Sequence, residues 1–133
     1  MSTTAKLTAA RKNTMADALA TSLNSGYLRI YSGTEPATAD TALSGNTLLA
    51  ELRFNATAAP SAVAGLLTFN AITQDSSNDA SGTATFFRAF RSNGTTVEFQ
   101  GAVGTTGTAL VMSSTTITAG GTTAVSSLTY QVQ

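Results

Sequence analysis

The chain has 133 residues, the size of a single domain with its own core. Only 11% of the residues are charged, the formal net charge is zero, and histidine and cysteine are absent. This composition excludes disulfides, thiolate catalysis and zinc sites of the usual type, and it argues against nucleic acid or an anionic membrane as a partner, because both bind basic surfaces.

A helix is predicted within residues 1–25, ahead of a β domain at 26–133. Thr3 or Thr4 can cap its start, and residues 24–26 supply a left-handed cap at its end. Its apolar residues repeat with the three- and four-residue spacing of one helical face, and they are Leu7, Ala10, Met15, Ala18, Leu19 and Leu23.

The first turns of this helix are basic. Lys6, Arg11 and Lys12 all precede the first acidic residue, Asp17, although the whole chain is neutral. One interpretation is a solvated face on a helix that packs against a sheet. The other is an arm that docks onto an acidic partner.

The first strand is predicted at residues 26–33, where the helical spacing gives way to strict alternation. Leu28 and Ile30 lie on the inner side, and Tyr27 and Tyr31 lie on the outer side. After this strand nearly every segment has the pattern of strands and turns.

A polar surface loop is predicted at 32–46. Its length is at the upper limit for loops in compact domains, which suggests that it contacts a neighbouring molecule. A second strand at 47–54 then alternates again. Its inner residues are Leu48, Ala50, Leu52 and Phe54, and its outer residues are Leu49, Glu51 and Arg53.

A long strand at 82–91 carries Phe86, Phe87 and Phe90, so aromatic side chains point to both of its faces. Such a strand is either central in a sandwich or covered on its outer face. The Asn-Gly turn at 92–94 connects it to the next strand as a hairpin.

Further short strands are predicted at 66–72, 109–112, 115–119 and 122–132, separated by glycine-rich turns. In the last of them Leu128, Tyr130 and Val132 alternate with polar residues. Short strands at regular spacing are typical of an antiparallel β-sandwich of the jelly-roll or immunoglobulin-like type. The predicted fold is therefore mainly β, with one N-terminal α-helix before the sandwich.

Residues with catalytic potential are few. A serine or threonine nucleophile would need a lysine, and Lys6 and Lys12 both lie on the predicted helix. Glu51 and Glu98 could form a carboxylate pair, but both lie on outer strand faces. We therefore expect no enzyme and no catalytic, cofactor-binding or metal-binding residues.

One long run, LRIYSGTEPATAD at 28–40, is followed in order by six shorter segments at 48–52, 71–73, 82–85, 87–88, 101–104 and 116–120. Together these segments resemble a family of small virion proteins of tailed bacteriophages. They cover most of the chain after the helix and hold strand and turn residues without catalytic content. Residues 92–99 do not match the family.

The resemblance implies a structural head protein, of the decoration or cement type, that binds the outer surface of the major capsid protein lattice and stabilises the head. It would be made in the host cytoplasm, in keeping with the absence of an apolar export signal behind Lys6, and would reside on the capsid surface of the virion. Its docking residues would be Lys6, Arg11 and Lys12. A tail component belongs to the same class.

A different class of protein also fits the pattern. In a carbohydrate-binding or adhesive module, on a tail fibre or a cell surface, Tyr27 and Tyr31 would be exposed and would stack on sugars.

Self-association is expected from the predicted faces. Leu49, Phe86, Phe87 and Phe90 provide more bulk than one sandwich interior can hold, and monomers seldom expose large apolar patches. These four residues would form the oligomer interface. A homotrimer matches the three-fold positions of an icosahedral lattice, which the resemblance implies, and a dimer is the alternative.

Overall fold

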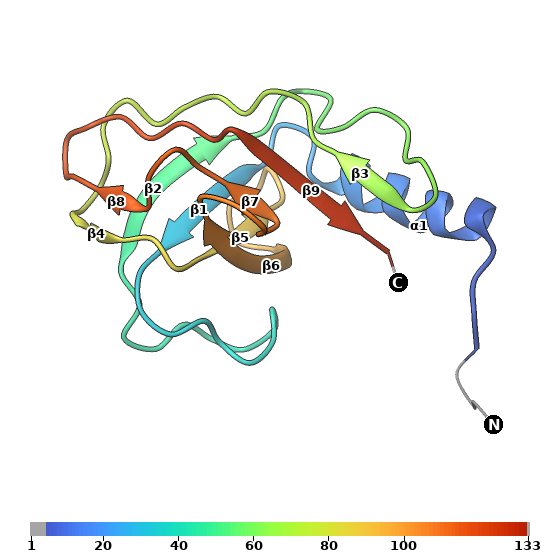
Figure 1. Ribbon diagram of the computed structural model, residues 1–133, viewed down its shortest axis with the longest axis horizontal. Coiled ribbons are helices and arrows are strands. Elements are labelled where there is room, and N and C mark those ends of the chain that lie inside the picture. The colour runs from blue at the N-terminus through green and yellow to red at the C-terminus, as the bar shows by residue number, and fades with distance from the viewer. Residues whose placement is uncertain (1–4, 133) are drawn as a thin grey trace.

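The computed structural model describes residues 5–132. Within them, one helix, α1 (Ala9–Ser22), lies at one end of the molecule beside β3, and the short strands β4 and β8 lie at the other end (Figure 1). The strands are β1 (Tyr27–Tyr31), β2 (Leu48–Arg53), β3 (Leu66–Thr68), β4 (Gly82–Thr83), β5 (Phe86–Phe90), β6 (Val97–Gly104), β7 (Leu110–Val111), β8 (Thr116–Ile117) and β9 (Ser127–Gln131).

Seven strands form one sheet in the order β2-β1-β5-β6-β7-β9-β3, and β4 pairs with β8 in a separate two-stranded sheet. The mainly β fold with one N-terminal helix is confirmed. The prediction of a purely antiparallel arrangement is wrong at one place, because β6 and β7 run parallel, with Val103 opposite Leu110. There the chain turns back over residues 105–109 and pairs the other side of β7 with β9.

The inner face of the sheet forms the main core. Leu28 and Ile30 of β1 are fully buried there, as the alternation predicts. Phe99 of β6 contacts Phe87 edge-on, with 5.4 Å between ring centroids, and lies 5.2 Å from the ring of Tyr130 on β9. Aromatic packing therefore joins both halves of the sheet.

The outer face of β5 is buried as well. Phe86, Arg88 and Phe90 lie opposite Tyr31, Arg29 and Tyr27 of β1, respectively, and all three β5 residues are buried. The ring of Phe86 stacks on Tyr31, with centroids 5.2 Å apart. Of the two arrangements that the sequence allows for this strand, the structure has the one with a covered outer face.

The four residues predicted to form an oligomer interface do not lie on the surface. Leu49, Phe86 and Phe87 are fully buried within the chain, and Phe90 is 6% exposed. Leu49 departs from the predicted alternation because the pairing of β1 with β2 shifts register, so that Tyr31 lies opposite Leu48. The interface assignment is therefore corrected, since these side chains pack inside one chain.

Helix α1 buries a different face from the predicted one. Thr8 caps its start, and the predicted caps Thr3 and Thr4 lie outside the described residues. Ala16 and Ala20 are buried against Ala59, Ala62 and Leu67, whereas Leu7 and Met15 are 40% and 47% exposed. Alanines occupy this contact because the helix lies close to the backbone of 58–65.

Two polar side chains fix the helix in this position. Asn13 Oδ1 accepts a hydrogen bond from the backbone of Gly65 at 2.7 Å, and Asp17 Oδ1 accepts one from Ala62 at 2.8 Å. The predicted left-handed cap within residues 24–26 is confirmed, because Ser25, with φ of 56°, takes the left-handed conformation after the helix end.

Both outer edges of the seven-stranded sheet carry further chain. Along β2, Arg53 exchanges backbone hydrogen bonds with Thr73, and Glu51 N donates to Asp75 Oδ2. Along β3, Leu66 exchanges backbone hydrogen bonds with Val63. Short segments from the loops thus bond to β2 at Glu51 and Arg53 and to β3 at Leu66.

Candidate functional site

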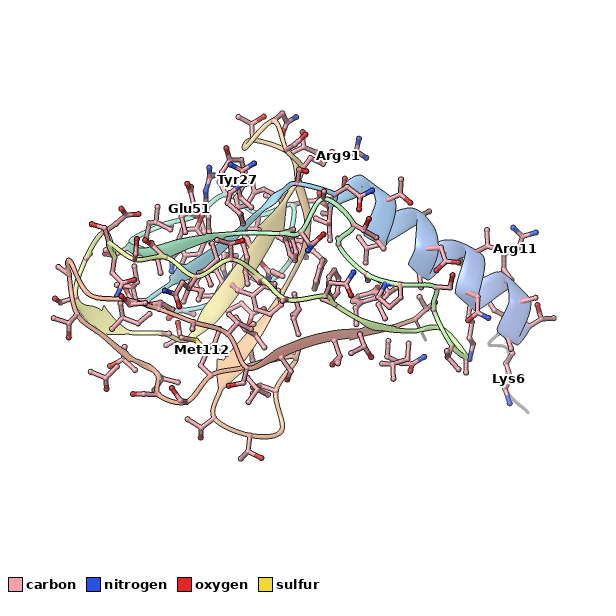
Figure 2. All side chains as sticks on the ribbon, turned by 90° about the horizontal axis from the view of Figure 1, so that it is seen from above. Lys6, Arg11, Tyr27, Glu51, Arg91 and Met112 are labelled. Carbon is pink, nitrogen blue, oxygen red and sulfur yellow. The ribbon has the colours of Figure 1, made fainter. Side chains whose placement is uncertain are left out.

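The basic end of the molecule, defined here as Lys6, Arg11 and Lys12, lies at the tip of α1. Figure 2 shows Lys6 and Arg11 at the end of the helix farthest from the sheet, and both are exposed. Lys12 is half-buried because its aliphatic stem lies against Gly65. The positive end of the helix dipole lies in the same place and adds to the local charge.

These cations have no carboxylate partner in the part of the chain that the structure describes. There, the ion pairs are Arg29 with Glu51 and Arg91 with Glu98. The basic end is therefore available to an acidic partner, and it lies well away from Arg91 (Figure 2).

A second group of charged side chains surrounds Tyr27 on the outer face of the sheet. The guanidinium of Arg53 lies 4.1 Å from the centroid of the Tyr27 ring, and that of Arg29 lies 4.4 Å from the Phe90 ring. Arg29 also binds Glu51 at 2.6 Å and donates to the carbonyl of Gly94. These contacts join β1 and β2 to the hairpin turn after β5, which is a structural role.

The two tyrosines proposed to stack on sugars are not free to do so. Tyr31 is 4% exposed and its ring stacks on Phe86, while Tyr27 is half-buried under the guanidinium of Arg53. Burial raises the pKa of the Tyr31 phenol above its ordinary value of 10.0, although Arg29 and Arg88 act in the opposite direction. The burial of Tyr31 contradicts the expectation that both tyrosines are exposed, on which the sugar-stacking interpretation depends.

Glu51 and Glu98, considered above as a catalytic pair, each form an ion pair with an arginine. Glu51 binds Arg29 on one side of the sheet face, and Glu98 binds Arg91 beside the hairpin. Asp75 accepts hydrogen bonds from the backbones of Glu51 and Ser77. Within residues 5–132 no group of three acidic residues comes together as a metal site.

The 32–46 loop has no regular secondary structure, yet the sheet holds it firmly. Arg88, which is 4% exposed, donates to the carbonyls of Thr38 and Thr41 and to Gln100 Oε1 at 3.0 Å. Gln100 in turn donates to the carbonyl of Pro36 at 2.8 Å. The loop therefore covers the outer face of β5 and β6 and explains the burial of that face.

The two ends of the loop are also fixed. Ser32 N donates to the carbonyl of Thr47, which brings the ends together. Asn46 Nδ2 donates to the carbonyls of Ser32 and Thr34, each at 3.0 Å. Compact loops with adjacent ends are frequently functional.

The loop forms an open, shallow hollow of about 420 Å³ at the surface. Its apolar lining comes from Pro36, Ala37 and Ala42, and Glu35 lies at the same hollow. A smaller polar hollow of about 250 Å³ lies between α1 and residues 57–61. The loop hollow is thus the larger of the two, and all of its lining residues come from one segment.

The sequence pattern predicted the basic end and the surface position of the loop. It missed the hollow and the burial of Arg88, because the Arg88 contacts join residues about fifty positions apart. The only signal in the sequence is the unusual length of a polar segment that carries Glu35 and Asp40 without a cation.

No helix in the described part of the chain is long and apolar enough to cross a membrane. No known protein family, curated protein or solved structure matches this chain.

Proposed function

We propose that this protein is a non-enzymatic structural component of a tailed-bacteriophage virion, a decoration or cement protein that binds the outer surface of the major capsid protein lattice. The resemblance of residues 28–40 and the six following segments to small phage virion proteins supports the proposal. The low content of charged residues supports it too, because short hydroxyl side chains lose little entropy when a surface becomes an interface.

The observation that carries the docking proposal is the exposed basic end. Lys6 and Arg11 project from the tip of a helix that is anchored to the β domain through Asn13 and Asp17 (Figure 2). Within the described residues these cations have no carboxylate partner, so an acidic surface can pair with them without first breaking an internal ion pair. We propose that this end contacts an acidic patch of the coat protein.

Two finer proposals accompany this one. A sandwich of jelly-roll or immunoglobulin-like type is proposed from the strand spacing, although the outer face of β5 is covered by the 32–46 loop and not by a second sheet. A homotrimer is proposed from lattice symmetry alone, because the apolar residues once assigned to its interface are buried. Sedimentation equilibrium of the purified protein distinguishes monomer, dimer and trimer.

A cryo-EM map of the virion tests the proposed function. We expect density for this chain at many symmetry-related positions on the outside of the head, and we expect the purified protein to co-sediment with heads that lack it. Density on the tail alone would contradict the head assignment. That result would favour the second class, a tail-associated adhesive module.

A further inference from the structure

The 32–46 loop and its buried anchor stand out among the features that the proposed function does not use. Arg88 carries a full charge in the interior, and the two ion pairs of the described residues leave it without a carboxylate. Burying an unpaired charge is strongly destabilising unless hydrogen bonds compensate it. Here backbone carbonyls of the loop and Gln100 provide those bonds.

Hydrogen bonds from the sheet, and one within the loop, act on the walls of the loop hollow. Arg88 holds Thr41, Gln100 holds Pro36 and Asn46 holds Thr34, and these residues all line the hollow. The hollow is therefore preformed, and a partner that enters it does not have to order the loop first. A long loop without secondary structure that is nevertheless held in one conformation indicates a binding role.

The chemistry of the loop defines what fits it. Pro36, Ala37 and Ala42 offer an apolar lining, and about 420 Å³ is enough for one or two side chains. Glu35 and Asp40 give residues 32–46 two negative charges and no positive one, and both are exposed. A complementary segment therefore carries an apolar side chain next to a lysine or arginine.

We propose that the hollow of the 32–46 loop is a second docking site, which receives an apolar side chain flanked by lysine or arginine from the coat protein. This inference rests on the proposed function. In Figure 1 the loop lies on one side of the sheet, away from the tip of α1. The acidic loop and the basic end would therefore contact different parts of the lattice. The protein then bridges two surface features of the head.

Binding of purified variants to heads that lack the protein tests the site. Ala42→Trp fills the hollow from an exposed position, and the double variant Glu35→Lys with Asp40→Lys reverses its charge. We expect each to weaken binding by roughly tenfold or more, as loss of a central contact does. Ala119→Trp and Asp79→Lys, at exposed positions in other loops, are matched controls and should bind like the unchanged protein.

The outcomes separate the two proposals. If the unchanged protein does not bind heads, the proposed function fails and this inference fails with it. If it binds and the hollow variants bind equally well, the inference alone is overturned. A change in self-association of the hollow variants, with head binding intact, would assign the hollow to a contact between copies and also overturn it. Equal thermal unfolding of variants and controls ensures that a loss of binding reflects the site.

Discussion

Arg88 Nε donates to Gln100 Oε1 across β5 and β6 at 3.0 Å, and the same two side chains hold the carbonyls of the loop above them. The guanidinium of Arg88 and the amide of Gln100 thus attach the 32–46 loop to the outer face of the sheet, where a sandwich would have a second sheet. The outer face is closed by polar contacts to backbone, while Phe86 and Phe90 lie on either side of Arg88 in the same layer.

Arg88→Met should destabilise the protein and loosen the loop. Methionine has a similar length but leaves the carbonyls of Thr38 and Thr41 without their donor, so the free energy of unfolding should fall by about 1–3 kcal/mol. Urea denaturation measures this change, and limited proteolysis should cut within 32–46 sooner. Arg91→Met, at a half-exposed ion pair, is the control and should cost less than about 1 kcal/mol. Equal losses in both variants would contradict the anchoring role.

Gly26→Ala should be strongly destabilising. A Cβ at this position would lie 2.2 Å from the carbonyl oxygen of Phe90 and 2.9 Å from that of Leu23, so the junction between α1 and β1 would have to open. We expect a loss of about 3 kcal/mol or more in thermal or urea unfolding, the range of large steric effects. Gly45→Ala meets no atom within 4 Å and should cost only about 1 kcal/mol for its φ of 71°.

Two alanines of α1 distinguish the observed helix face from the predicted one. Ala16 is fully buried against the 58–62 segment, whereas Ala18 belongs to the predicted apolar face and is exposed. Ala16→Leu should therefore cost about 1–3 kcal/mol through overpacking, and Ala18→Leu should be almost neutral. A lower urea midpoint for Ala18→Leu than for Ala16→Leu would instead support the predicted apolar face.

The alternation of side chains predicted the strands well where a single face is buried. Leu28 and Ile30 in β1, and Leu128 in β9, are buried as expected. The pattern failed at Leu49, because a shift in register is not visible in one strand's sequence. It also failed in α1, because alanine carries little hydrophobic signal even when close packing makes it the buried residue.

The burial of both faces of β5 could be predicted only as one of two alternatives. Its cover comes from a segment about fifty residues away, and polar side chains rather than apolar ones attach that cover. The basic end, by contrast, was predictable because its three cations are close together in sequence, with Arg11 and Lys12 in the first turn of α1 and Lys6 just before the helix.

The stability of the protein should fall in alkali because of Tyr31. Burial raises the pKa of its phenol in the folded state, so the folded chain holds a proton that the unfolded chain releases near pH 10. The contribution is complete below pH 10 and is lost as the pH rises through the folded-state pKa. In urea titrations between pH 8 and 11.5, Tyr31→Phe should show a shallower loss than the unchanged protein. Parallel curves would exclude this role for Tyr31.

Binding to heads should depend on salt if the basic end docks electrostatically. Between about 0.1 M and 1 M salt the Debye length falls from ~10 Å to ~3 Å, and the affinity should fall with it. Removing residues 1–12 should weaken binding, but that deletion also removes the first turn of α1. Lys6→Gln with Arg11→Gln is the cleaner variant and should reduce both affinity and salt dependence, whereas Arg91→Gln should change neither. A salt-independent affinity would leave the helix with a packing role only.

The covered edges of the seven-stranded sheet bear on how copies behave when crowded. An open edge strand offers a row of backbone donors and acceptors that can template fibrils or domain-swapped aggregates. Here Thr73 and Asp75 bond to the edge of β2, and Val63 bonds to Leu66 at the start of β3. Where many copies are held at high local concentration, in a cell or on a particle surface, we therefore expect neighbouring copies to meet mainly through side chains. Such contacts depend on individual residues, whereas pairing between open strands does not.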